Sequence, residues 1–317
     1  MSRSLSYHYR VFGLNVVSEM ELPELEEAHF SNADVTVVFE AVPCCLVNAK
    51  KVRESFEATE EQLLLRVNDV GRFLVEEGKH IRIDLDDGSD DRSVRLFLLG
   101  SCFGAILHQR GVMPLHASAI DTPRGAILIC GNSGMGKSTT VTALVDRGYR
   151  MITDDVAALR KEGGRFWLET AYPQVKLWEN SLQHLGKDTE GLDQVRPELS
   201  KRVLRLGSSI ANKPCKVLGL VWFYFGEGPS LREARGNERF FAIKKNVYRR
   251  SFLTPSRKRS HYARCIDLAR QLPIYCLERP ETENSIDRVV GLIELLAKGD
   301  VEVFHRGEND IEFEELL

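Results

Sequence analysis

This sequence lacks the long apolar segments that mark membrane and secreted proteins. No stretch approaches the ~18 uninterrupted apolar residues that a membrane helix needs, and no apolar region follows the first arginine at the N-terminus. We therefore expect neither a membrane span nor a secretory signal, and no membrane partner.

Cysteines spaced as metal ligands are also missing. The seven cysteines include no CxxC pair and no Cys/His spacing of a zinc site. An odd, scattered set predicts reduced thiols and hence a cytoplasmic protein. The chain contains no internal repeat and no low-complexity segment.

The composition is that of a soluble globular enzyme. Apolar residues make up 43% and charged residues 28%, with a net charge of −3. These values exclude a disordered tail, a collagen and a nucleic-acid packaging protein, and they point to no particular partner. A length of 317 residues predicts two units, since domains usually hold about 100–200 residues.

The predicted architecture is α/β (α+β), with a small, mainly β N-terminal domain over residues 1–92. Short alternating runs predict strands at 7–12, 34–40, 62–67, 72–77 and 80–85. Helical spacing over 93–110 predicts a helix, within residues 93–111, that links this domain to the next.

Residues 112–317 form the predicted second domain. Its expected strands are 115–120, 125–130, 149–153, 156–160, 165–169, 217–225 and 274–277, and its expected helices are 137–146 and 284–297. The stretch 186–214 lacks periodicity and is predicted to be loop-rich or an irregular helical insertion.

A phosphate-binding loop of the form GxxxxGK[ST] follows the apolar strand at 125–130 and precedes a helix. In this pattern glycines turn backbone N–H groups toward phosphate, the lysine reaches the β and γ oxygens, and the hydroxyl ligates Mg²⁺. The residues expected to bind ATP are Gly131, Asn132, Ser133, Gly134, Met135, Gly136, Lys137, Ser138 and Thr139. Read alone, the loop could serve a kinase, a motor, a GTPase or a transporter.

Two aspartates, Asp154 and Asp155, end the next predicted strand. That strand should run parallel to the P-loop strand, and ligands gather at the carboxyl ends of such strands. One carboxylate could then reach the metal and the other the incoming hydroxyl. An isolated Asp-Asp pair more often begins a turn or caps the next segment.

His116 lies on the strand before the P-loop strand. A lone histidine there is more often a hydrogen-bonded core residue than a catalytic one.

His116, the P-loop that begins fifteen positions later, and the run from Arg147 to Asp155 together resemble the catalytic core of HPr kinase/phosphorylase. This resemblance implies a P-loop kinase core like that of HPr kinase and phosphoenolpyruvate carboxykinase, which transfers phosphate from ATP to a serine. The glycine-rich lid and HRD loop of ordinary protein kinases are absent here too.

The resemblance also implies roles for individual residues. Lys137 would hold phosphate, Ser138 and Asp154 would ligate Mg²⁺, the Asp154-Asp155 pair would supply the base, and His116 would assist at the phosphate end. Glu169 is the nearest counterpart of the family's metal-ligating glutamate. Arg235 and Arg239 are the candidates for its catalytic arginine.

The opening residues 9–19 and 22–25, and the segment 171–178, are similar to HPr-kinase-like proteins encoded with lasso-peptide genes. That subgroup implies a precursor peptide with a C-terminal serine as substrate, rather than the HPr protein.

The stretch from Arg239 to Arg264, both included, holds nine lysine and arginine residues and no acidic one. The run could be a solvated helix face, or it could attract ATP phosphates or an acidic peptide. Nucleic acid is a third reading, which the absence of an RNA- or DNA-binding motif weakens.

The favoured hypothesis is an ATP- and Mg²⁺-dependent serine kinase acting on a peptide or protein. Alternatives are an HPr-type kinase/phosphorylase, a small-molecule hydroxyl kinase, and a nucleotide-dependent binding module in which the aspartates are structural. A homo-oligomer is compatible with the sequence.

Overall fold

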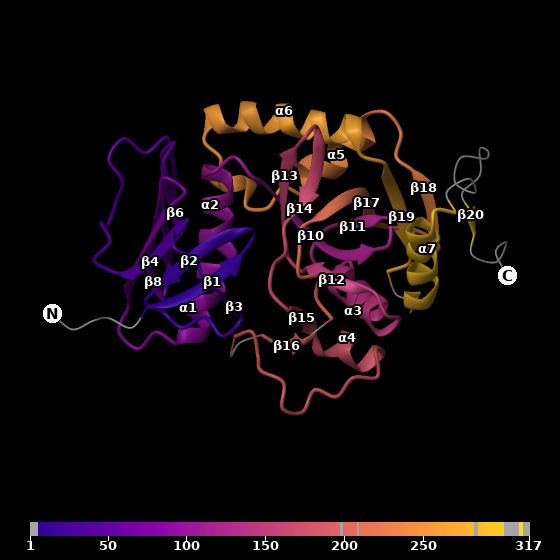
Figure 1. Cartoon of the computed structure of the whole chain (residues 1–317), viewed down its shortest axis with the longest axis horizontal. Coiled ribbons are helices and arrows are strands. Elements are labelled where there is room, and N and C mark those ends of the chain that lie inside the picture. Colours follow the sequence, from indigo (N-terminus) through magenta and orange to yellow (C-terminus); the bar gives the residue numbers. More distant parts are fainter. Residues whose placement is uncertain (1–5, 197–198, 208, 282–284, 301–310, 313–317) are drawn as a thin grey trace. The chain divides into compact units, whose positions relative to one another are not determined.

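The computed structural model describes residues 6–196, 199–207, 209–281, 285–300 and 311–312 (Figure 1). The chain divides into two compact units. The first comprises Met1–Pro114, Gln194–Leu199 and Tyr248–Ala263, and the second comprises Leu115–Asp193, Ser200–Val247 and Arg264–Leu317. The helix predicted to link two domains therefore belongs to the first unit, and two later segments return to that unit.

The first unit is built on one sheet in the strand order β3-β1-β2-β4-β9-β8-β7-β6-β5. Its strands are β1 (Tyr7–Val11), β2 (Leu14–Ser18), β3 (Glu26–Glu27), β4 (Val35–Phe39), β5 (Lys51–Arg53), β6 (Phe56–Ala58), β7 (Gln62–Val67), β8 (Gly71–Glu76) and β9 (His80–Leu85). Most neighbours are antiparallel, while β4 pairs parallel with both β2 and β9. The mainly β character predicted for this region is confirmed.

The turn between β1 and β2 shows how the local sequence sets this sheet. Phe12 and Gly13 have φ values of 53° and 73°, so both central residues of the turn are left-handed. A two-residue turn of this kind matches the natural twist of the strands that it joins. It pairs Val11 with Leu14 and brings Tyr7 opposite Ser18.

The helix predicted at 93–110 is present, with a π-helical segment in its middle. It consists of α1 (Asp91–Phe97), η1 (Leu98–Cys102) and α2 (Phe103–Gln109). The Asp90 side chain caps its start by accepting a hydrogen bond from the backbone N–H of Ser93. Every residue of the π segment is buried, and the helix lies against β8.

The second unit combines a mixed sheet with helices. Its strands are β10 (Met113–Thr122), β11 (Gly125–Cys130), β12 (Arg150–Thr153), β13 (Val156–Glu162), β14 (Arg165–Leu168), β15 (Gln174–Trp178), β16 (Lys201–Arg205), β17 (Cys215–Phe225), β18 (Ser230–Glu233), β19 (Ile274–Arg279) and β20 (Ile311–Glu312). Its helices are α3 (Lys137–Asp146), α4 (Glu179–His184), α5 (Asn237–Lys245) and α7 (Ile286–Lys298). Two further elements are η2 (Arg250–Phe252), in the first unit, and α6 (Pro255–Gln271), which begins in the first unit and ends in the second.

The sheet runs in the order β11-β10-β13-β14-β17-β19-β18-β20, and an added β11–β17 pairing closes part of it into a ring. Strands β11 and β12 each pair antiparallel with β10, so they run in the same direction. Cys130 lies opposite Ala117 and Thr153 opposite Ala119, which brings the carboxyl ends of β11 and β12 to one edge. The predicted parallel direction of these two strands is confirmed.

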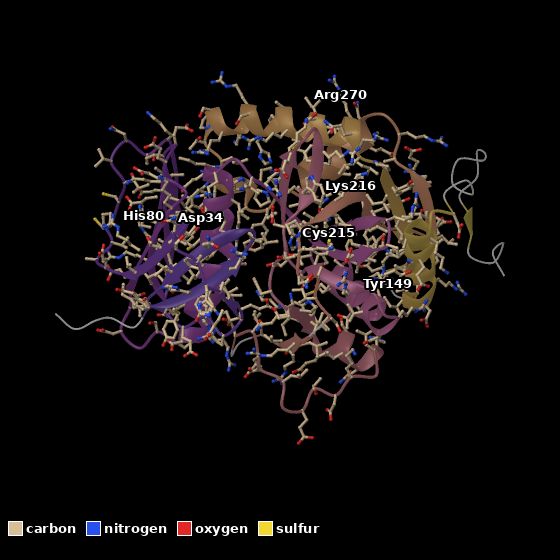
Figure 2. All side chains as sticks on the ribbon, in the orientation of Figure 1. Asp34, His80, Tyr149, Cys215, Lys216 and Arg270 are labelled. Carbon is tan, nitrogen blue, oxygen red and sulfur yellow. The ribbon has the colours of Figure 1, made fainter. Side chains whose placement is uncertain are left out.

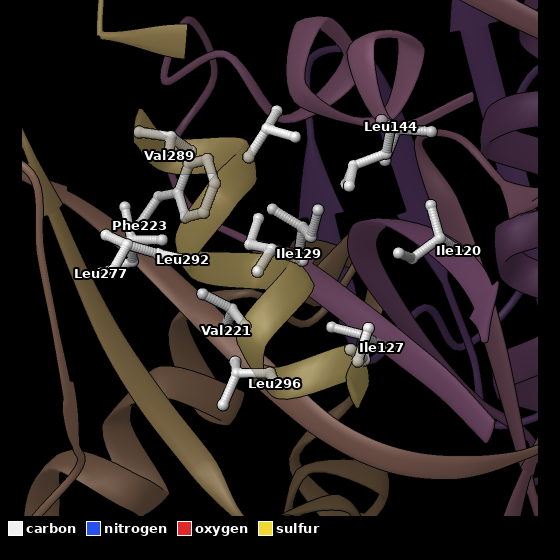
Figure 3. Close-up of a cluster of buried hydrophobic side chains, with 14 of the residues drawn as sticks. Ile120, Ile127, Ile129, Leu144, Val221, Phe223, Leu277, Val289, Leu292 and Leu296 are labelled. Carbon is white, nitrogen blue, oxygen red and sulfur yellow. The ribbon is translucent and has the colours of Figure 1, made fainter. Parts of the chain in front are cut away.

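The core of the second unit lies between this sheet and helices α3 and α7. Buried aliphatic side chains from β11, β17 and β19 pack against Leu144 of α3 and Leu292 of α7 (Figure 3). Helix α7 repeats apolar residues at helical spacing and buries that stripe, which explains why its sequence pattern predicted it. The core holds the P-loop strand in place.

The segment predicted to be loop-rich contains regular structure. Strand β16, at Lys201–Arg205, pairs antiparallel with β15, and Trp178 lies opposite Lys201. Outside β16 the described residues of 186–214 form no named helix or strand, in agreement with the loop-rich prediction. Strand β16 itself was not predicted, because it is short, polar and half-buried and shows no clear apolar alternation.

All seven cysteines are free thiols, and five of them are buried. Cys215 and its exposed neighbour Lys216 begin β17 (Figure 2).

None of the described helices combines the length and the apolar character that a bilayer crossing needs.

Candidate active site

The P-loop and the aspartate pair line one open cleft of about 580 Å³ within the second unit. Its lining residues are His116, Ser118, Ser133, Gly134, Gly136, Lys137, Ser138, Thr139, Asp154, Asp155, Lys176, Leu177, Trp178, Ser181 and Lys201. Residues predicted separately from three sequence segments therefore meet at one place.

Two glycines give the P-loop its shape. Gly131 has a φ of 154°, and a Cβ there would lie only 3.0 Å from the Cβ of Phe223. Gly136 has a φ of 82°, and a Cβ there would collide with the Nη1 of Arg279. Gly136 also begins α3 without a side-chain cap, which leaves the first N–H groups of the helix available to an anion.

Lys137 is tied to the loop and to His116. Its Nζ donates to the carbonyl oxygens of Gly131 and Asn132 at 2.9 and 3.2 Å and lies 3.1 Å from the Nε2 of His116. Burial lowers the pKa of this ammonium, and the neighbouring carboxylates Asp154 and Asp155 partly oppose that shift. A bound phosphate would replace the carbonyl partners of Lys137.

His116 joins Lys137 to Asp155. Its Nδ1 lies 3.0 Å from the Oδ1 of Asp155, while its Nε2 faces Lys137. A protonated lysine can only donate, so Nε2 accepts and the ring proton lies on Nδ1, facing Asp155. The histidine that alone resembled a core residue is thus part of the cleft.

Asp155 is held in its ionised form. Burial raises its pKa, but the hydrogen bond from His116 and the positive charges of Lys176 and Lys201 outweigh burial, so the pKa lies well below the ordinary aspartate value. The backbone of Asp155 has a φ of 76°, which is strained for a residue other than glycine.

Asp154 has different partners. Its Oδ1 accepts hydrogen bonds from the hydroxyls of Ser118 and Ser138 at 2.5 and 2.8 Å, and its Oδ2 accepts from the backbone N–H of Lys176 at 3.2 Å. The side chain is therefore fixed beside the P-loop hydroxyl, while Asp155 is fixed beside His116.

Ser138 and Asp154 together fit the requirements of Mg²⁺. They place a hydroxyl and a carboxylate oxygen 2.8 Å apart, and Mg²⁺ in nucleotide sites takes one or two protein oxygens, with waters and phosphate oxygens completing its shell. Within the described ranges, no three side chains among His, Cys, Asp and Glu converge as a ready-made metal site.

The structure does not bring Glu169 into this cleft. Its carboxylate is buried and pairs with the Nε of Arg160 at 2.7 Å. The register of β13 and β14 allows this pair, because Arg160 lies opposite Trp167, two residues before Glu169. The predicted role of Glu169 as a metal ligand has no geometric support.

The two predicted arginines also lie outside the cleft. Arg239 donates to the carbonyl oxygens of Ala269 and Leu272 and pairs with Glu233, so its guanidinium is committed to the fold. Arg235 is exposed, before the start of α5.

Arg279, which belongs to none of the sequence motifs, lies beside the phosphate loop instead. Its Nη1 donates to the carbonyl oxygen of Met135 at 3.1 Å, and its Nε is buried with no hydrogen-bond partner among the described residues. Burial lowers the pKa of this guanidinium. The sequence signal for Arg279 was its position at the carboxyl end of β19. This strand runs parallel to β17, and ligands bind at the carboxyl ends of such strands.

The basic run from Arg239 to Arg264 lies on helices α5 and α6 and in the turns between them. None of the residues of this run lines the cleft. Arg257, in the first unit, donates to the carbonyl oxygens of Glu60 and His108. Part of the run is therefore occupied by contacts inside the fold.

A comparison with protein families identifies the core. Residues 111–176 match the family model described as HPr Serine kinase C-terminal domain. The chain is HPr-kinase-like over this segment. The segment includes His116, the P-loop and both aspartates, so the resemblance drawn from those residues is confirmed.

Curated HPr-kinase relatives match over short stretches. The HPr kinase/phosphorylase of Clostridium botulinum (strain Eklund 17B / Type B) is 46% identical over 50 residues, which is 16% of each chain. That of Caldanaerobacter subterraneus subsp. tengcongensis is 41% identical over 90 residues, which is 27% of this chain and 29% of the relative. The chain thus spans less than a third of either relative's length.

A solved HPr-kinase structure is more distant. The Hpr(Ser) kinase/phosphatase from Coxiella burnetii is 13% identical, with 60% of this chain and 97% of that chain covered at a TM-score of 0.34. The description of residues 111–176 as HPr-kinase-like therefore rests on the sequence matches.

Proposed function

We propose that this protein is an ATP- and Mg²⁺-dependent kinase that transfers the γ-phosphate to a serine hydroxyl of a peptide or protein. The observation that carries the proposal is the single cleft that holds Lys137 and Ser138 of the P-loop together with Asp154 and Asp155. Phosphoryl transfer needs positioned phosphate, neutralised charge and one proton acceptor, and this cleft offers a group for each.

The two aspartates have different roles in this proposal. Asp154, fixed by Ser118 and Ser138, would hold Mg²⁺ together with Ser138, and the metal would neutralise charge on the phosphates. Asp155 would orient the acceptor hydroxyl and receive its proton, because its carboxylate is ionised and not bound to the P-loop hydroxyl.

A carboxylate with a low pKa is a weak base, but this reaction does not require a strong one. In a largely dissociative transition state the acceptor proton leaves late, so position matters more than basicity. His116 contributes by fixing the Oδ1 of Asp155 on one side and Lys137 on the other.

The favoured acceptor is a ribosomal precursor peptide of the lasso type, on the basis of the opening residues and the segment 171–178. An HPr-type protein, with reverse phosphorylase activity, and a small hydroxyl compound are the alternatives within the same chemistry. A nucleotide-dependent binding module is the alternative of another class.

The test is to incubate purified protein with ATP, Mg²⁺ and serine peptides, including peptides ending in serine, and to detect phosphopeptide by mass spectrometry. Asp155→Asn should lower the rate at least about 100-fold with little change in ATP affinity. Asp154→Asn should raise the Mg²⁺ concentration needed for half-maximal activity, because it replaces a charged metal ligand. Asp287→Asn is the matched control, because this side chain is 91% exposed.

Two results would count against the proposal. If both cleft variants form product at the wild-type rate, the aspartates are structural. If wild-type protein binds ATP but phosphorylates neither peptide, protein nor small hydroxyl compounds, the binding-module alternative is favoured.

A further inference from the structure

The β15–β16 hairpin forms the wall of the cleft that carries Lys176, Trp178 and Lys201, which we call the hairpin wall. Lys176 and Trp178 are two residues apart on β15 and therefore point to the same face of the strand. Trp178 lies opposite Lys201 on β16, and the Nζ of Lys201 is 5.7 Å from the centre of the indole ring. Strand β15 packs beside α3, the helix that follows the P-loop (Figure 1).

The two lysines of this wall have no carboxylate within ion-pair distance among the described residues. Other lysines of the same unit do: Lys161 pairs with Asp267 at 2.6 Å, and Lys187 pairs with Asp146 at 2.8 Å. Two half-buried ammonium groups face one cleft without a direct ion pair among the described residues, and although the charge of Asp155 acts on both, the two together can attract a further anion.

The wall is attached directly to the aspartate pair. The backbone N–H of Lys176, in the middle of β15, donates to the Oδ2 of Asp154, which fixes the position of β15 relative to that carboxylate. The side-chain charges of Lys176 and Lys201 also help to lower the pKa of Asp155. An anion bound to these lysines would therefore lie close to a hydroxyl held by Asp155.

The phosphates of ATP already have their own partners. The P-loop offers Lys137 and the N-terminal N–H groups of α3, and β19 places the guanidinium of Arg279 beside the loop. The lysines of the hairpin wall come from β15 and β16 instead. They would contact the acceptor peptide from the side away from the ATP phosphates.

We propose that the hairpin wall is a subsite for a carboxylate that the acceptor peptide carries next to its phosphorylated serine. Lys176 and Lys201 bind the carboxylate, and Trp178 packs against the adjoining part of the peptide. The carboxylate comes either from an acidic side chain or from the chain terminus. This inference rests on the proposed kinase function for its role, but the binding it describes can be measured without turnover.

The experiment measures binding of short fluorescein-labelled serine peptides to the full chain by anisotropy, without ATP. Each peptide is made in a neutral form, a form with glutamate beside the serine, and a form with a free terminal carboxylate after the serine. We expect at least one carboxylate form to bind about tenfold more tightly than the neutral form, as one charge-assisted contact allows.

Lys176→Met and Lys201→Met should each remove most of that preference, while binding of the neutral peptide changes by less than about twofold. Lys176→Arg should retain it, since the charge remains. Lys216→Met is the matched control: it makes the same change of charge at an exposed position on β17, outside the cleft (Figure 2).

Comparison of the two carboxylate forms distinguishes a side chain from a chain terminus. The proposal is overturned if wild-type protein binds neutral and carboxylate peptides equally. It is also overturned if the methionine variants weaken both equally, or if they weaken ATP binding instead, since the lysines would then serve the nucleotide. Failure of the kinase function would appear differently, as a retained carboxylate preference with no phosphopeptide after ATP is added.

Discussion

The side-chain carbonyl of Asn246 accepts a hydrogen bond from the backbone N–H of Gly131 at 3.0 Å. The backbone carbonyl of the same residue accepts from the N–H of His116 at 2.6 Å, and its side-chain amide donates to Ala242 at 2.7 Å. A single buried asparagine at the end of α5 therefore joins the first residue of the P-loop to the strand that carries His116.

This contact predicts that Asn246→Ala weakens both the fold and nucleotide binding. The buried N–H of Gly131 would lose its partner, which costs about 1–3 kcal/mol of unfolding free energy. We expect ATP affinity to fall about tenfold by calorimetry, with the loss of stability seen in urea unfolding. Asn237→Ala, at an exposed position on the same helix, is the control. Unchanged ATP affinity in Asn246→Ala would mean that the contact does not shape the loop.

Arg279 predicts a second effect on nucleotide binding. Arg279→Met removes the donor to Met135 and the positive charge under the loop, so ATP should bind about tenfold more weakly. The loss should shrink at high salt, because screening weakens the attraction that the variant lacks. Arg270→Met, at an exposed position on α6, should leave ATP affinity unchanged (Figure 2). Equal affinity of wild type and Arg279→Met at low salt would exclude this role.

The low pKa of Asp155 predicts how activity depends on pH. His116→Leu removes the hydrogen bond that lowers this pKa, while burial, which raises it, remains, so the pKa should rise. The acid limb of the pH–rate profile should then move to higher pH than in the wild type. His116→Asn, whose amide can donate from near the Nδ1 position, should move it less. Identical acid limbs in all three proteins would contradict the assignment of Asp155.

The same pKa shift predicts a pH-dependent stability. A carboxylate whose pKa is lowered in the folded state adds stability above its unfolded pKa of about 3.9, and this is lost as pH falls toward the folded value. The free energy of unfolding of the wild type should therefore exceed that of His116→Leu at pH 7. The difference between these two free energies should become smaller below about pH 4. Urea unfolding at several pH values measures it. A difference that stays constant with pH would show that His116 stabilises by packing alone.

The core beneath the P-loop predicts that two phenylalanines of strand β17 contribute very differently to the free energy of unfolding. Phe223 is 1% exposed and packs in the core, whereas Phe225 is 40% exposed. Phe223→Ala should destabilise by about 3–5 kcal/mol, because it removes buried apolar area and leaves a cavity. Phe225→Ala should change stability by less than about 1 kcal/mol. Similar urea midpoints for the two variants would show that the core can refill the space.

The sequence by itself determined those features that depend on neighbouring residues. The strand before the P-loop, the loop and helix α3 have the predicted bounds, because apolar alternation, glycine spacing and helical periodicity are local properties. The positions of Asp154 and Asp155 at the end of a strand running with β11 also followed from local pattern and strand direction. The HPr-kinase-like segment was recognisable for the same reason.

Only the tertiary structure decided which distant side chains join the cleft. Lys201 lines the cleft, and Asn246 and Arg279 hydrogen-bond to the P-loop backbone. All three lie far from the P-loop in sequence, and no local pattern encodes the strand pairing or packing that brings them there. The same long-range contacts placed Glu169 beside Arg160 and Arg239 beside the carbonyl oxygens of Ala269 and Leu272, away from the site. Residue type indicates what chemistry a side chain can perform, but its partners depend on contacts between segments far apart in the chain.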